Sequence, residues 1–213
     1  NVSLYNETNG KSILPTPVIG MVGIVEDIEK VIHMNAKNNE TLFIIGQDEN
    51  KYDGFLQSSL YQEIFCDDFL GQVPPIDLKK EKQFHDFVMK LNDNEIINSA
   101  HDISDGGLLP CMIEMLLFNK LGIDINLPPR IQNPNEENLL FLHGWLFGED
   151  QSRIIISTNK PDKLMEFSKS ENIKIYCIGK TNNTGVVEIP KYDSICINKC
   201  LDLYNNTIPN LFS

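Results

Sequence analysis

The sequence has few cysteines and no pairing pattern among them. Its five cysteines are odd in number, and no two of them form a Cys-x-x-Cys pair. This pattern favours neither a disulfide framework nor a paired-cysteine zinc site. Cys196 and Cys200 lie one helical turn apart, but no matching Cys or His pair accompanies them, so we expect no metal there. A reducing compartment, the cytoplasm, is the simplest location for such a chain.

Long apolar runs and clustered basic residues are also missing. No apolar run reaches the roughly 18 residues of a membrane-spanning helix. The 30 acidic residues outnumber the 18 basic ones, which gives a formal net charge of −12. Nucleic acids and anionic membranes attract clustered Lys and Arg, so we expect neither as a partner. Any phosphate would instead be held by helix N-termini and a divalent metal with oxygen ligands.

The most informative stretch is the turn from His101 to Leu108, which joins a predicted strand at 96–100 to an apolar helix at 108–118. Ser104 or Asp105 can cap this helix. The turn holds the candidate site residues His101, Asp102, Ser104, Asp105, Gly106 and Gly107. The unpaired N–H groups at the helix start suit an anion such as a phosphate. The alternative is an ordinary capped turn, because Asp-Gly-Gly turns are frequent.

Apolar periodicity predicts that strands and helices alternate along the rest of the chain. The predicted strands lie at 18–25, 41–46, 123–127, 154–157, 173–178 and 186–189. The predicted helices begin at 57, 78, 136, 161 and 194. The strand at 18–25 is apolar on both faces and is therefore expected to be buried on both. The last two strands are joined too tightly for a parallel crossover, so we expect an α+β domain, in which helices cover a mixed sheet in one compact unit.

Two further polar stretches can carry chemistry. Residues 1–10 are dense in oxygen-bearing side chains, which can ligate a hard cation or bond a substrate; the alternative is a solvated terminus. Residues 148–153 form a second polar turn before a buried strand. Its charged groups either face a site or solvate a loop.

Four motifs together resemble a known family. They are Asn-Val-Ser-Leu-Tyr-Asn-Glu at 1–7, Pro-Thr-Pro-Val-Ile-Gly-Met-Val-Gly at 15–23, Ala-His-Asp-Ile-Ser-Asp-Gly-Gly-Leu at 100–108 and Phe-Gly-Glu-Asp-Gln-Ser-Arg at 147–153. In this order they resemble the C-terminal part of the small form of phosphoribosylformylglycinamidine synthase, the PurL subunit, in the AIR synthase-related superfamily. The resemblance covers nearly the whole chain.

This resemblance implies a single C-terminal domain over 1–213, with residues 1–14 as the end of a preceding nucleotide-type domain or a linker. The implied fold is a three-layer α/β/α sandwich like the AIR synthase C-terminal domain. The implied enzyme is a ligase that uses ATP and Mg2+. It phosphorylates the amide oxygen of formylglycinamide ribonucleotide, and ammonia displaces the phosphate to give the amidine, ADP and phosphate. The implied partners are a glutaminase subunit that supplies ammonia, a small accessory subunit and the other domains of the same chain.

The family's functional residues map onto only part of this sequence. Its metal-binding asparagine corresponds to Asn1 and its substrate-binding serine to Ser3. The catalytic histidine and the nucleotide-holding residues belong to family segments absent here, so the isolated chain is expected not to catalyse. A substrate-contacting Gly-Glu-Ser-Gln turn of the family's first half reads Gly-Glu-Asp-Gln at 148–151, and the added carboxylate would oppose a phosphorylated substrate.

The resemblance leaves the role of the central turn open. It either holds a phosphate in a pseudo-symmetric pocket or packs against another domain, and we favour the structural role because nearby carboxylates would repel an anion without magnesium. These carboxylates belong to Asp102, Asp105, Glu149 and Asp150. Two other functions stay open: another superfamily member, such as a thiamine-phosphate kinase or a selenophosphate synthetase, and a non-catalytic assembly domain.

Overall fold

A computed structural model describes residues 6–13, 18–46, 54–66, 71–132 and 136–212. The chain divides into two compact units, Asn1–Val31 and Ile32–Ser213. The site residues predicted at Asn1 and Ser3 lie outside the described residues.

The first unit contains a hairpin of β1 (Glu7–Thr8) and β2 (Lys11–Ser12), followed by the 3-10 turn η1 (Ile28–Lys30). The predicted strand at 18–25 is wrong for this structure, because these residues form no strand. Their apolar side chains are exposed, with Val18 at 93% and Val22 at 102% relative exposure. A strand exists only where neighbouring strands bond its backbone, and the described part of this unit supplies none for the segment.

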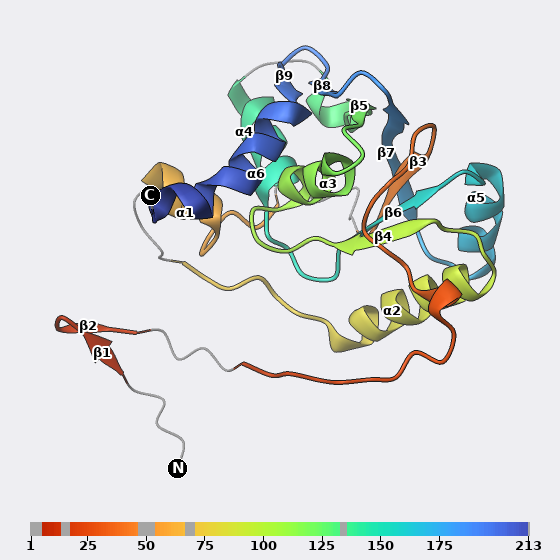
Figure 1. The fold of residues 1–213 in the computed structure, drawn as a ribbon, viewed down its shortest axis with the longest axis horizontal. Coiled ribbons are helices and arrows are strands. Elements are labelled where there is room, and N and C mark those ends of the chain that lie inside the picture. The colour runs from red at the N-terminus through yellow and green to blue at the C-terminus, as the bar shows by residue number, and fades with distance from the viewer. Residues whose placement is uncertain (1–5, 14–17, 47–53, 67–70, 133–135, 213) are drawn as a thin grey trace. The chain divides into compact units, whose positions relative to one another are not determined.

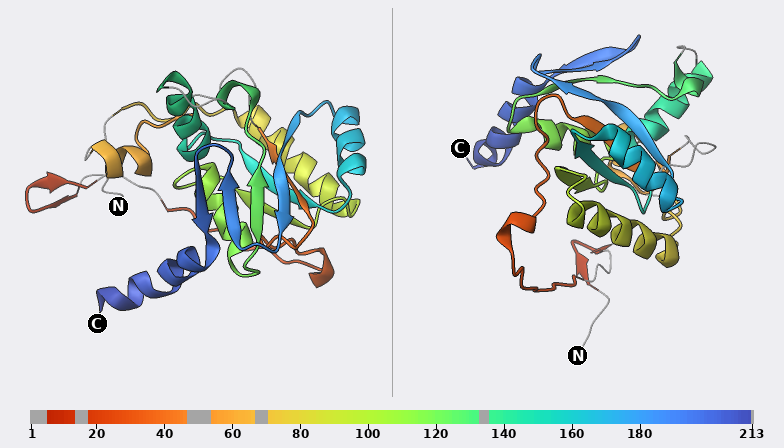
Figure 2. Two further views of the ribbon diagram at one scale, coloured as in Figure 1. Left: turned by 90° about the horizontal axis from the view of Figure 1, so that it is seen from above. Right: turned by 90° about the vertical axis from the view of Figure 1, so that its right-hand side faces the viewer.

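The second unit is built on one seven-stranded sheet in the order β4-β6-β3-β7-β5-β8-β9 (Figures 1 and 2). The strands are β3 (Thr41–Ile45), β4 (Ser99–Asp102), β5 (Gly122–Ile125), β6 (Ile154–Thr158), β7 (Ile175–Asn182), β8 (Val186–Ile189) and β9 (Asp193–Cys196). Every neighbouring pair is antiparallel except β5 and β8, which are parallel. The predicted mixed sheet is therefore confirmed.

Helices cover both faces of this sheet, as the right-hand view of Figure 2 shows. They are α1 (Leu60–Cys66), α2 (Leu78–Asp93), α3 (Leu108–Leu117), α4 (Glu136–Phe147), α5 (Pro161–Ser170) and α6 (Ile197–Leu211), with the short η2 (Pro129–Ile131) beside α4. Strand β3 shows why two layers form. Leu42 and Ile44 join the core cluster of α3 and α4, while Phe43 and Ile45 join that of α2 and α5. The predicted three-layer α/β/α arrangement is confirmed.

Several predicted elements are confirmed with small shifts at their ends. In α2, Phe87 and Leu91 are buried and Phe84 and Val88 pack beside them. These four residues form one apolar stripe along the helix, at the spacing typical of an amphipathic helix. The predicted strands at 173–178 and 186–189 become β7 and β8, which lie on either side of β5 instead of pairing with each other. The predicted helix at 194–204 is wrong at its start, because Asp193–Cys196 pairs with β8 as β9 and the helix begins only at Ile197.

Candidate functional site

The two polar turns singled out in the sequence meet in the second unit. The Gly106 N–H donates to Glu149 Oε1 at 2.8 Å. Gly107 lies against the backbone that precedes Glu149, since a Cβ on it would be 2.6 Å from the Phe147 carbonyl carbon and 2.7 Å from Gly148 O. Both glycines have a positive φ, of 80° and 82°. The contact therefore requires glycine at both positions.

A third segment, residues 54–60, joins these two turns. The Leu60 N–H also donates to Glu149 Oε1, at 2.9 Å. The Glu149 N–H donates to Phe55 O at 2.9 Å, and the Phe55 N–H donates to Asp150 Oδ2 at 3.0 Å. The backbones touch closely, because a Cβ on Gly54 would lie 1.8 Å from Gly144 O. We call the meeting of 54–60, 104–107 and 147–150 the three-turn junction.

The buried Arg153 contacts two residues of the junction, Gly148 and Asp150. Its side chain is 2% exposed, donates to Gly148 O and lies with its nitrogen 3.5 Å from Asp150 Oδ2. Burial lowers the pKa of the Arg153 guanidinium, and the Asp150 carboxylate acts in the opposite direction. The two acidic residues of the second turn are thus both bonded inside the protein.

The first residues of the central turn belong to the sheet. His101 and Asp102 are the last two residues of β4, whereas the predicted strand at 96–100 ended before them. His101 Nε2 lies 2.9 Å from Glu114 Oε2, and its Nδ1 lies 3.4 Å from Asp102 Oδ1. The Cys111 thiol donates to Asp102 O at 3.2 Å. Burial, followed by the charges of Glu114 and Asp102, raises the pKa of Cys111, so this thiol is not an activated nucleophile.

The predicted cap of α3 by Ser104 or Asp105 is wrong. Gly107 is the N-cap residue and makes no side-chain cap bond, while Ser104 and Asp105 are both exposed. The carboxylate at the helix start comes instead from Glu149, which lies 43 residues further along the chain from Gly106. A pattern confined to neighbouring residues holds no signal for such a distant partner.

Sequence reasoning also missed an aromatic pair beside the junction. Tyr61 Oη lies 2.6 Å from His143 Nδ1, and the Tyr61 ring stacks on Phe147 with centroids 5.6 Å apart. Burial raises the pKa of Tyr61 and lowers that of His143. The hydrogen bond between the Tyr61 hydroxyl and His143 Nδ1 ties α1 to α4.

A shifted form of a capping box holds the start of α1. The Gln62 N–H donates to Ser59 Oγ at 3.3 Å, and Gln62 Oε1 accepts from the Ser58 N–H at 2.7 Å. The helix start is thus held both by its own cap and by Glu149.

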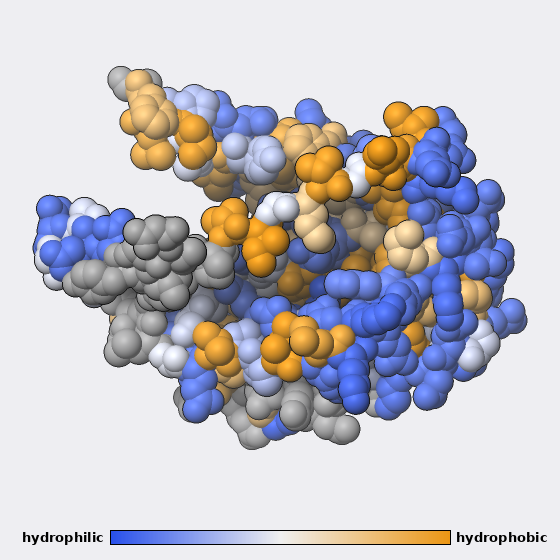
Figure 3. Space-filling model, turned by 90° about the horizontal axis from the view of Figure 1, so that it is seen from below, coloured by the Kyte–Doolittle hydropathy of each residue, from blue (hydrophilic) through white to orange (hydrophobic). Residues whose placement is uncertain are grey.

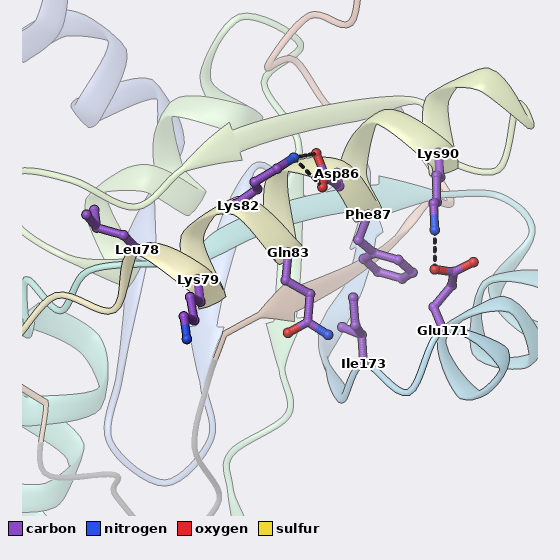
Figure 4. A pocket seen from close by; sticks show the side chains of 9 residues that line it. All are labelled: Leu78, Lys79, Lys82, Gln83, Asp86, Phe87, Lys90, Glu171 and Ile173. Carbon is purple, nitrogen blue, oxygen red and sulfur yellow. Dashed lines mark hydrogen bonds and ion pairs between the residues drawn. The ribbon is translucent and has the colours of Figure 1, made fainter.

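A separate groove of about 470 Å³ lies between α2 and residues 171–173 (Figure 4). Its floor holds the apolar Phe87 and Ile173, and Lys90 pairs with Glu171 across it at 2.5 Å. Lys82, on the rim, pairs with Asp86 at 2.7 Å. Most of the cations that could attract an anionic ligand here are therefore matched by carboxylates.

Metal and membrane sites find no support in the described ranges. Among these residues, no three or more His, Cys, Asp or Glu side chains gather as metal ligands. No helix built from them is long and apolar enough to cross a membrane.

Comparison with known families agrees with this fold. The family described as "AIR synthase related protein, C-terminal domain" matches residues 37–190, which include β3 to β8. The chain belongs to this family. The matched range contains the whole three-turn junction.

Curated relatives extend the comparison. The chain is 38% identical over 184 residues to the phosphoribosylformylglycinamidine synthase subunit PurL of Azorhizobium caulinodans, covering 85% of this chain and 23% of that protein. It is 35% identical over 190 residues to the PurL subunit of Caldanaerobacter subterraneus, covering 88% and 24%. The chain therefore spans about a quarter of the length of the curated relatives it matches.

Solved structures share the fold. Thermotoga maritima PurL complexed with FGAR superimposes with a TM-score of 0.62 at 14% identity, covering 82% of this chain and 30% of that one. T. maritima PurL complexed with ATP gives a TM-score of 0.59 at 15% identity, covering 82% and 28%. At these identities the likeness concerns the fold alone.

Proposed function

We propose that this chain is the C-terminal domain of a PurL-type synthase that makes formylglycinamidine ribonucleotide in purine biosynthesis. The reaction consumes ATP: the amide oxygen of formylglycinamide ribonucleotide takes the γ-phosphoryl group, and ammonia then displaces phosphate. The products are the amidine, ADP and phosphate. The observation that carries the proposal is the 35–38% identity to curated PurL subunits over more than four fifths of the chain.

The domain boundaries follow from the same proposal. Residues 1–14 would be the end of a preceding domain or a linker, and 18–25 would add its apolar strand to a sheet in the rest of the longer polypeptide. The exposure of Val18, Ile19, Met21 and Val22 supports this second point, because both faces of the segment lack cover within the first unit. Ammonia would come from a glutaminase subunit, with a small accessory subunit and a cytoplasmic location.

Asn1 and Ser3 are proposed to contact the metal and the substrate in the longer polypeptide. There, Ser3→Ala should raise the Michaelis constant for formylglycinamide ribonucleotide, since a hydrogen bond to a charged ligand contributes about 1.5–3 kcal/mol. Asn1→Ala should shift the magnesium dependence. Wild-type kinetics in both variants would remove these two residues from the site.

ATP and Mg2+ are proposed to bind mainly through parts of the longer polypeptide beyond this chain. Among the described residues, no three or more His, Cys, Asp or Glu side chains gather as metal ligands, and the central turn is bonded to Glu149. The isolated chain should therefore fold without turning over ATP. Purified chain with ATP, magnesium, formylglycinamide ribonucleotide and ammonia should give no ADP above a no-protein control, and substrate-dependent ADP would contradict this assignment.

A non-catalytic assembly role is the second candidate, and the end of α6 favours it. Leu203, Tyr204, Ile208 and Leu211 are each more than half exposed along this helix, which forms the arm at the upper left of Figure 3. Such a stripe suits an interface with another subunit. Replacing Ile208 and Leu211 by Ser should then weaken co-purification with the glutaminase subunit and leave ammonia-dependent activity of the longer polypeptide unchanged.

A further inference from the structure

One carboxylate oxygen in the three-turn junction accepts two backbone amides from distant parts of the chain. Glu149 Oε1 accepts the Gly106 N–H at 2.8 Å and the Leu60 N–H at 2.9 Å. Gly106 directly precedes the N-cap residue of α3, and Leu60 is the first residue of α1. The Leu60 N–H, at the first position of its helix, has no partner within that helix, and the Gly106 N–H lies before the start of α3; both donate to the Glu149 carboxylate instead.

The backbone around Glu149 is fixed on both sides. Its own N–H donates to Phe55 O at 2.9 Å. Gly148, just before it, is so close to the neighbouring segment that an added Cβ would lie 2.7 Å from Gly54 Cα. On the other side, an added Cβ on Gly107 would lie 2.7 Å from Gly148 O. The closely packed backbone therefore holds the half-buried Glu149 carboxylate against the Gly106 and Leu60 amides.

We propose that Glu149 is the internal anion of the central turn. Its carboxylate accepts the Gly106 N–H that an external phosphate would otherwise use, and this closes the turn to anions. The same carboxylate positions segment 54–66 on α4. This assignment decides between the two roles that the sequence left open, in favour of the structural one. It concerns contacts within this chain and does not depend on the proposed ligase activity.

Competition explains why the turn stays closed. A carboxylate tethered within the fold has a high effective concentration at the two donor amides, which a free anion at millimolar concentration does not match. The charge of Glu149 also repels a second anion at the same amides. Phosphate should therefore leave the melting temperature of the wild-type chain unchanged at constant ionic strength.

The experiment uses the 213-residue chain with Glu149→Ala and, as a matched control, Glu188→Ala, which removes an exposed carboxylate on β8. Glu149→Ala should lower the melting temperature by about 5–10 °C, while Glu188→Ala should change it by less than about 1 °C. Amide hydrogen exchange at both Gly106 and Leu60 should accelerate by about tenfold or more in Glu149→Ala. Formate should then fill the vacated position and raise the melting temperature of this variant by about 3 °C over chloride at equal ionic strength.

Three results would overturn the assignment: a phosphate-dependent stabilisation of the wild-type chain, unchanged exchange at both amides in folded Glu149→Ala, or no formate rescue of that folded variant. If Glu149→Ala does not fold, Glu149→Gln carries the test, because it keeps an acceptor oxygen without the charge. Its two amides should exchange faster than in wild type, and wild-type exchange at both would reject the role. None of these readouts requires ATP turnover, so they separate this assignment from the proposed function.

Discussion

Glu40 is the clearest single point at which the second unit can be perturbed. Its side chain is 3% exposed immediately before β3. Oε2 accepts from the Lys37 N–H at 2.8 Å and from Ser157 Oγ at 2.7 Å, and Oε1 accepts from Asn98 Nδ2 at 2.6 Å. Ser157 Oγ in turn lies 2.7 Å from Ser99 Oγ. One carboxylate thus links β6 to the segments that lead into β3 and β4.

The expected cost of Glu40→Ala follows from these three bonds. Hydrogen bonds to a charged group contribute about 1.5–3 kcal/mol each, but burial of the carboxylate offsets part of their sum. Removing one member of such a buried charged network typically costs about 3–5 kcal/mol. For a chain of this size that corresponds to a fall in melting temperature of about 6–20 °C. Glu40→Gln should also destabilise, because all three partners of the carboxylate are donors and the amide would face one of them with its own NH2 group.

The assay is equilibrium unfolding in urea of wild type, Glu40→Ala, Glu40→Gln and the exposed control Glu188→Gln. The order of stability should be wild type and Glu188→Gln first, then Glu40→Gln, then Glu40→Ala. A free energy of unfolding for Glu40→Ala within about 0.5 kcal/mol of wild type would refute the reasoning, because breaking a buried charged network should destabilise the fold by more than that.

Three further predictions follow from other contacts. Burial lowers the pKa of His143, so the unfolded chain takes up the proton first as pH falls. The contribution of His143 to the free energy of unfolding should therefore be complete above about pH 6.5 and be lost below it. In a pH series of urea unfolding, His143→Gln should flatten this part of the curve, whereas the exposed control His85→Gln should not. Gly148→Ala places a Cβ 2.5 Å from Gly144 O and should lower the free energy of unfolding by about 1–3 kcal/mol, measured by calorimetry. Gly20→Ala, whose Cβ would have no atom within 4 Å, should leave it unchanged. Equal melting temperatures for the two variants would contradict the close packing at Gly148. Because burial raises the pKa of Cys111, a thiol reagent at pH 8 should modify exposed Cys66 and leave Cys111 intact in the folded chain, and prompt labelling of Cys111 would show the site to be open.

Local patterns predicted the helices and strands that are specified by residues close together in the sequence. The stripe in α2 and the apolar run of α3 specify helices by their period alone, and alternation specifies β8 to the residue. The three-layer fold came from the family resemblance, and the mixed sheet came from loop lengths. These features depend on residues that are neighbours in sequence or on the family motifs that this sequence contains.

The misses share a physical cause, which is dependence on distant partners. The pattern at 18–25 marks an apolar segment, but it does not say whether the strands that would pair with it lie in this chain. Asp105 is a good local cap by type, yet α3 begins without a side-chain cap, and Glu149 bonds the Gly106 N–H just before it. Residues 193–196 carry no strong strand signal, and only pairing with β8 makes them a strand.

The most direct test of the central claim is the activity of the longer polypeptide that contains this chain. Given formylglycinamide ribonucleotide, ATP, magnesium and ammonia, it should form the amidine product and ADP in equal amounts, and the 213-residue chain alone should form neither. Turnover with thiamine phosphate or selenide, and none with formylglycinamide ribonucleotide, would contradict the proposed function.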